Sequence, residues 1–96
     1  MTETFGDVIL SVQGGSKLCS FPRRDGLLAE DYLLTEVAII PQRGRGFLTP
    51  EDVGVDEAAC YWVDRDTAYP VGAFVPQGAV QALRQALQGR KAKGGV

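Results

Sequence analysis

An apolar stripe near the C-terminus constrains the fold of this 96-residue chain more than any other feature. Val80, Leu83 and Leu87 recur at intervals of three and four residues and are flanked by alanines, which is typical of an amphipathic helix. Pro76 suits the first helical position and Gly89 suits a left-handed C-cap, so the predicted helix runs between them. Because a helix of about a dozen residues is marginal alone in water, it must bury this stripe on another layer.

That layer is predicted to be a sheet, because the first half of the chain has the patterns of strands. Asp7 to Gln13 alternates with the period of a strand, and the glycines at 14–15 predict a tight turn into a returning strand over Ser16 to Phe21. Val37 to Ile40 is continuously apolar and stops at Pro41. We expect it to be a central strand that is buried on both faces.

The second half of the chain predicts a short helical turn and a hairpin. Thr49, Pro50 and Asp52 suit the N-cap, the first position and the capping-box partner of a helix, and Gly54 predicts that it stops after one turn. An aromatic strand over 60–63 and a second strand over 71–75 are expected to pair as a hairpin across an acidic turn. The stretch over 27–34 fits either a loop or a single helical turn.

These elements predict an α+β fold, in which a small four- or five-stranded, mainly antiparallel sheet has the C-terminal helix packed on one face. Residues 1–90 are expected to form a single domain, with residues 91–96 as a flexible tail rich in basic residues and glycine.

The composition argues against most classes of enzyme. The chain contains no histidine, the commonest general base and the imidazole ligand of metal sites. Two cysteines without histidine cannot complete a usual zinc site, and the glycines match no phosphate-binding motif. Asp64 and Asp66 are expected to shape a turn. We therefore predict a protein that is not an enzyme and that holds no metal or cofactor.

Charge, hydropathy and cysteine content indicate a cytoplasmic protein with no membrane partner. No apolar run approaches the ~18 residues of a membrane span, and the acidic N-terminus does not resemble a signal peptide. Cys19 and Cys60 fall in predicted strands and are expected to act as small buried hydrophobes. A net charge of −2 argues against a general affinity for nucleic acid.

The predicted hairpin supplies the leading candidate site, a surface for a protein partner. Proline cannot donate to a sheet, so Pro70 places the following strand at the edge, where a partner can add a strand. The aromatic strand next to it is either exposed or packed in the core, and the sequence leaves the position of Trp62 open. The candidate partner-binding residues are Tyr61, Trp62, Tyr69, Val71, Ala73 and Phe74.

A second candidate site is basic. Arg43 and Arg45 flank a glycine in one loop, and a guanidinium there can bind phosphate in fork geometry. Arg23 and Arg24 join them if both loops emerge at the same sheet edge, with an aromatic residue of the hairpin stacking on a base.

Two functions remain as expectations. The leading one is a non-enzymatic protein-binding module, either a homo-oligomer or a small accessory or regulatory subunit. The alternative is binding of nucleic acid or a phosphate ligand through the loop of Arg43 and Arg45.

Overall fold

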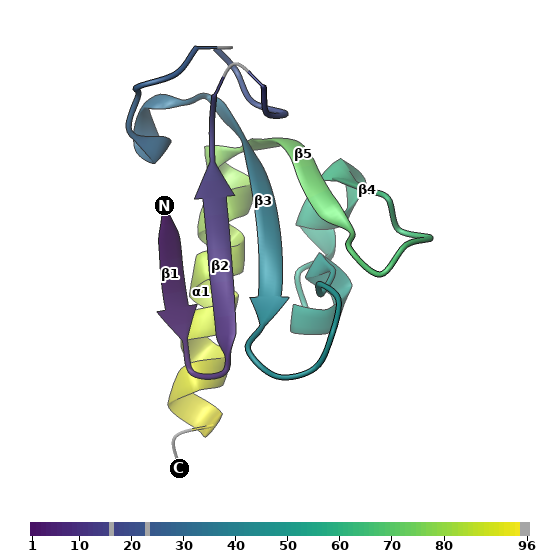
Figure 1. The fold of residues 1–96 in the computed structure, drawn as a ribbon. Coiled ribbons are helices and arrows are strands. Elements are labelled where there is room, and N and C mark those ends of the chain that lie inside the picture. The colour runs from purple at the N-terminus through teal and green to yellow at the C-terminus, as the bar shows by residue number, and fades with distance from the viewer. Residues whose placement is uncertain (16, 23, 95–96) are drawn as a thin grey trace.

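The computed structural model describes residues 1–15, 17–22 and 24–94 of the chain, with side chains described as far as residue 89. Within these residues a five-stranded antiparallel sheet has one long helix across one face, which confirms the predicted α+β fold (Figure 1). The strands are β1 (Thr2–Phe5), β2 (Val8–Gln13), β3 (Leu34–Pro41), β4 (Trp62–Val63) and β5 (Val71–Pro76), in the spatial order β1-β2-β3-β5-β4. The helix is α1 (Gln77–Gly94), and three 3-10 turns are η1 (Ala29–Asp31), η2 (Pro50–Val53) and η3 (Asp56–Tyr61).

The apolar stripe of α1 is the centre of the core, as its spacing predicts. Val80, Leu83 and Leu87 are at most 2% exposed and belong to one core cluster with the inner residues of β2 and β3. The helix begins one residue later than expected, because Pro76 is still paired with Leu34 as the last residue of β5.

The end of the helix differs from the prediction. Gly89 lies inside α1 without a positive φ, so its expected role as a left-handed C-cap is wrong. A glycine within a helix costs only about 1 kcal/mol relative to alanine, which the packed stripe before it offsets. Residues 91–94 of the predicted flexible tail continue the backbone of α1, and residues 95–96 lie outside the described residues, so the flexibility of the tail stays a prediction.

The partner of β2 is not the one that the glycine pair suggests. β2 pairs with β1 on one side and with β3 on the other, and Phe5 and Val8 close the β1–β2 hairpin. The predicted return strand is therefore wrong: of its described residues 17–21, only Phe21 forms a bridge, to Leu34. Both sides of β2 are already occupied, so this segment becomes part of the long connection to β3.

The first glycine of the pair, Gly14, is explained by its close contact with the ring of Tyr32 and not by a hairpin turn. A Cβ on Gly14 would lie 2.6 Å from ring atoms of Tyr32, which is only 2% exposed. The Tyr32 hydroxyl donates a hydrogen bond to the Arg24 carbonyl oxygen and so anchors the connection. Between residues 27 and 34 the chain makes only the single turn η1 before β3 begins, in line with the expected loop or single turn.

β3 is the central strand, as expected, but it is not buried on both faces. Thr35, Val37 and Ile39 point into the core and are fully buried, whereas Ala38 and Ile40 on the other face are only half-buried. The reason is that the described residues place no second layer on that face: in Figure 1 the viewer looks onto the bare sheet, with α1 behind it.

The expected sheet edge at β5 is also wrong, because β5 lies between β3 and β4. β4 consists of two residues, and Trp62 pairs with Gly72 while Val63 pairs with Val71. The residues before Trp62 form η3 instead of the predicted longer strand. Further along β5, a bulge gives Phe74 a φ of 53°, and its N–H donates to the Cys19 carbonyl oxygen at 3.0 Å.

The capping signature before η2 is confirmed. The Asp52 carboxylate accepts hydrogen bonds from the Thr49 backbone N–H at 2.8 Å and from the Thr49 hydroxyl at 3.0 Å. Gly54 then ends the turn with a φ of 79°. In the described part of the chain, no helix has the length and apolarity needed to cross a membrane.

Candidate functional site

The side of the sheet away from α1, here called the open face, carries apolar residues at its centre. Side chains alternate along a strand, so Val8, Leu10 and Val12 of β2 face α1 and Ile9 faces the other way. Ile9 pairs with Ile40 of β3, and both are half-buried. In an antiparallel sheet with one solvated face, these outward positions are usually polar.

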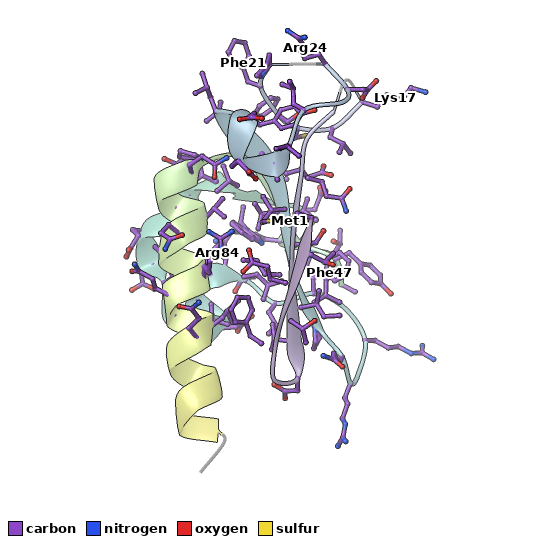
Figure 2. The ribbon with its side chains drawn as sticks, turned by 90° about the vertical axis from the view of Figure 1, so that its left-hand side faces the viewer. Met1, Lys17, Phe21, Arg24, Phe47 and Arg84 are labelled. Carbon is purple, nitrogen blue, oxygen red and sulfur yellow. The ribbon has the colours of Figure 1, made fainter. Side chains whose placement is uncertain are left out.

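An aromatic pair extends the open face beyond β3. Leu48 bridges to Ile39 and packs on the core, so its neighbour Phe47 lies on the opposite side. Figure 2 shows Phe47 projecting from the sheet away from α1. The Phe47 and Tyr69 rings meet edge to face, with centroids 5.1 Å apart and an interplanar angle of 83°. Tyr69 remains 55% exposed, so the pair borders solvent.

A close backbone contact holds this aromatic pair in place. The Phe47 N–H donates to the Ala68 carbonyl oxygen at 2.8 Å, which joins the two loops that carry the rings. Gly46 has a φ of 82°, and a Cβ there would lie 2.5 Å from the same oxygen. Only glycine permits this approach, so the position of the rings depends on it.

Residues of β4 and β5 form the other end of the open face. Val63 pairs with Val71 on the open side and is 44% exposed, while Trp62 beside it points into the core. The apolar residues of the open face are thus Ile9, Ala38, Ile40, Phe47, Val63, Tyr69 and Val71. By strand register, this face also carries the polar residues Thr2, Thr4, Ser11, Gln13 and Glu36.

Of the six predicted partner-binding residues, the structure places Tyr69 and Val71 on the open face, and Ala73 shares the side of Val71 because it follows the core-facing Gly72. Trp62 is 4% exposed and belongs to the core, and Tyr61 packs against the core from η3. Ala73 is half-buried in β5 and Phe74 is 39% exposed at the bulge, beside the connection that contains Cys19.

The candidate residues chosen from the sequence did not include five of the apolar residues on the open face, namely Ile9, Ala38, Ile40, Phe47 and Val63. The signal for Phe47 was the alternation of Phe47 and Leu48, which indicates one residue on each side of a strand-like segment. For Val63 the signal was its alternation with Trp62.

The arginines lie at opposite ends of the molecule. Arg43 and Arg45 are exposed in the loop after β3, directly before Phe47, while Arg24 lies in the connection before β3, at the far end in Figure 2. β3 has eight residues, which span roughly 26 Å in an extended strand. The expected grouping of the two loops is therefore wrong for Arg24, and Arg23 lies outside the described residues.

The acidic tip between β4 and β5 has a structural role in this arrangement. Arg65 donates in fork geometry to the Glu51 carboxylate at 2.7 and 3.1 Å and also to the Ala59 carbonyl oxygen at 2.9 Å. The hydrogen bond from Arg65 lowers the pKa of Glu51 below its ordinary 4.5, and the carboxylate in turn raises the pKa of Arg65. The tip is thereby tied to η2 and η3.

Asp64 shapes the turn at this tip, as predicted. It has a φ of 55°, and its carbonyl oxygen accepts hydrogen bonds from the N–H and hydroxyl of Thr67 at 3.1 and 2.8 Å. Among the described residues, no group of three or more His, Cys, Asp or Glu side chains is placed to hold a metal ion.

The described residues of the open face combine apolar and uncharged polar side chains with one carboxylate, that of Glu36. On this face the buried Ser11 hydroxyl accepts a hydrogen bond from the Gln13 amide at 3.2 Å, and Ser11 lies between Thr2 of β1 and Ala38 of β3. Comparison with known proteins adds no relative to this picture: no protein-family profile matches the chain, and neither curated proteins nor solved structures show significant similarity to it.

Proposed function

We propose that this chain is a non-enzymatic protein-binding module that docks through the open face of its sheet. The observation that carries the proposal is the cross-strand pair of Ile9 and Ile40 on a face that no described layer covers. Burying apolar surface stabilises a complex by about 25 cal/mol per Å² before the costs of association are subtracted. Neighbouring apolar residues on a sheet face without a covering layer, where polar residues are usual, support an interaction surface.

The residues at the border of the open face also have the composition of a protein interface. Tyr69 and Phe47 provide rigid aromatic area, and Arg43 and Arg45 lie at the rim, where their charges stay hydrated. Aromatic residues and arginine are enriched at interfaces. A small module with one such face suits the role of an accessory or regulatory subunit.

The two cysteines support a reducing location. Cys19 and Cys60 are both free thiols, and Cys60 is exposed. Exposed unpaired thiols are usual in the cytoplasm, where disulfides are rare, so we assign the protein to the cytoplasm within this proposal.

The test compares partners captured by wild type with those captured by an open-face variant. Ile40→Lys places a charge at the centre of the face, and Val63→Lys does so at a site that is already 44% exposed. Leu28→Lys is the matched control, because it makes the same change at a residue that is 64% exposed in the connection before β3. A genuine partner is retained by wild type and by the control.

The captured protein is then purified and its affinity measured by calorimetry. Both open-face variants should weaken binding by at least about tenfold, since a buried unpaired charge is costly. Circular dichroism establishes that each variant is folded. A partner that binds Ile40→Lys and Val63→Lys as tightly as wild type would show that the open face is not the docking surface.

One observation favours a second candidate function, binding of single-stranded nucleic acid. The exposed Arg43 and Arg45 lie four and two residues before Phe47, whose ring contacts that of Tyr69. Guanidiniums beside exposed aromatic rings are the elements that single-strand binders use for phosphates and bases. The stacking residue in this candidate is Tyr69, since Trp62 lies in the core.

Fluorescence anisotropy with a labelled single-stranded oligonucleotide tests this candidate. We expect an affinity that falls steeply with salt and is lost in the Arg43→Ala/Arg45→Ala variant. Arg24→Ala is the control, because Arg24 lies at the far end of β3. Absence of binding at low salt, or equal losses in both variants, would exclude the candidate.

A further inference from the structure

We infer that the partner on the open face is a second copy of this chain, packed sheet on sheet with the strands of the two copies running in opposite directions. This inference rests on the proposed function and names its partner. The two-fold axis lies across the strands, so β3 of one copy covers β3 of the other with its ends exchanged. Such packing of two sheets keeps the strands within about 30° of each other.

The size of the open face suits such a pair. β3 is eight residues long, which corresponds to roughly 26 Å, and five strands at a spacing of about 4.8 Å give a width near 20 Å. The other strands are only two to six residues long, so the face covers about 400 Å² on each copy and about 800 Å² in the pair, which corresponds to a weak, transient interface. Ala38 lies near the middle of β3, and its small side chain lets the two sheets approach closely.

The charges along β3 make the face complementary to itself only in this orientation. Glu36 lies on the open face toward the start of β3, half-buried and without an ion-pair partner among the described residues. Arg43 and Arg45 follow the other end of the same strand. A two-fold axis across the strands brings the arginine loop of one copy toward Glu36 of the other, twice over, as an isologous interface requires. Parallel packing would instead bring the two arginine loops together and the two glutamates together.

Sedimentation over a concentration series tests the association. Wild type and Leu28→Lys should approach twice the mass of the chain by about 100 µM, whereas Ile40→Lys and Val63→Lys should stay monomeric. A wild type that remains monomeric throughout overturns the inference. In that case, loss of another protein's binding in the same two variants would leave the proposed function intact with a different partner. A dimer that persists in both variants assigns self-association to another surface and also overturns the inference.

Exchanging the charges of Glu36 and of the two arginines tests the antiparallel orientation of the two copies. Glu36→Arg alone, or Arg43→Glu with Arg45→Glu, should weaken the dimer by at least about tenfold, because each change opposes like charges. The triple variant Glu36→Arg/Arg43→Glu/Arg45→Glu should regain the wild-type affinity. A dimer that is insensitive to these exchanges, or a triple variant weaker than either parent, overturns the antiparallel arrangement. Recovery by exchange distinguishes a contact between copies from a general effect of these residues on the fold.

Discussion

Gly72→Ala is the sharpest test of how the core is built. Gly72 lies in β5 between Val37 of β3 and Trp62 of β4, and its backbone conformation is open to any residue because its φ is not positive. The space beside it is not open. A Cβ would lie 2.6 Å from Cγ2 of Val75 and 2.7 and 2.9 Å from Cζ3 and Cη2 of Trp62.

Neither neighbour can move away cheaply, because Val75 is fully buried and Trp62 is 4% exposed. Forcing an extra methyl into a packed core costs about 1–3 kcal/mol. Replacing glycine by alanine within a strand returns about 0.5–1 kcal/mol. The net loss in the free energy of unfolding should be about 1–2 kcal/mol, which lowers the Tm of a domain of this size by roughly 4–16 °C.

Urea unfolding followed by circular dichroism measures this loss in every variant, and Trp62 fluorescence follows it as well in those that keep the tryptophan. Trp62→Phe supplies the second arm of a double-mutant cycle, since phenylalanine lacks the two indole atoms that the methyl would strike. It also removes an indole N–H that has no hydrogen-bond partner within the described residues. The cost of Gly72→Ala should fall by at least about 0.5 kcal/mol in the Trp62→Phe background, which exceeds the usual error of additivity.

Gly78→Ala in the first turn of α1 is the matched control. A Cβ there meets no atom within 4 Å, so this change should be neutral or stabilising by up to about 1 kcal/mol. If Gly72→Ala were as stable as wild type, or if its cost were the same with and without the indole, the close packing of β5 against Trp62 would be refuted.

Three further outcomes follow from particular contacts. Gly89→Ala should stabilise the protein by up to about 1 kcal/mol in thermal unfolding, because the residue is helical; a loss of stability would indicate a left-handed cap instead. Asp52→Ala should cost about 0.5–1.5 kcal/mol through loss of the capping box, whereas Asp52→Glu keeps a carboxylate at that spacing and should restore most of it in urea unfolding. The folded-state pKa of Glu51 is lowered, so its pair with Arg65 stabilises the fold above pH 4.5 and is lost as the pH falls through the lowered pKa. NMR titration of the carboxyl groups should therefore give a Glu51 pKa below 4.5 in wild type and a higher pKa in Arg65→Ala. Equal pKa values would contradict the pair of hydrogen bonds from Arg65 to the Glu51 carboxylate.

The candidate site was only partly predictable, for reasons that individual residues make plain. Tyr69 is a candidate from the sequence because it is an aromatic residue of the predicted hairpin, and it is exposed. Its ring partner Phe47 is 22 positions earlier in the chain, and nothing local indicates that the two loops meet. Trp62 looked equally suitable for a surface, but the pairing with Gly72 turns it into the core.

The pairing of the strands was the second feature that the sequence did not predict. The glycine pair at 14–15 fits a hairpin turn, yet β2 is flanked by β1 and β3 instead. Likewise Pro70 argues for an edge, but a two-residue strand is enough to cover the outer side of β5. A strand can accept any neighbour with a compatible register, so the choice depends on the whole sheet.

The sequence by itself therefore determined the features that depend on neighbours within one or two turns of the chain. The stripe of Val80, Leu83 and Leu87 is a helical face, and Asp52 caps the turn before Gly54, because these interactions join residues three or four positions apart. Only the tertiary structure decided the strand order, the inward turn of Trp62 and the apolar open face. These depend on pairing between distant segments and on which side of the sheet α1 covers, and hydrophobic burial is non-directional, so a local pattern does not select among them.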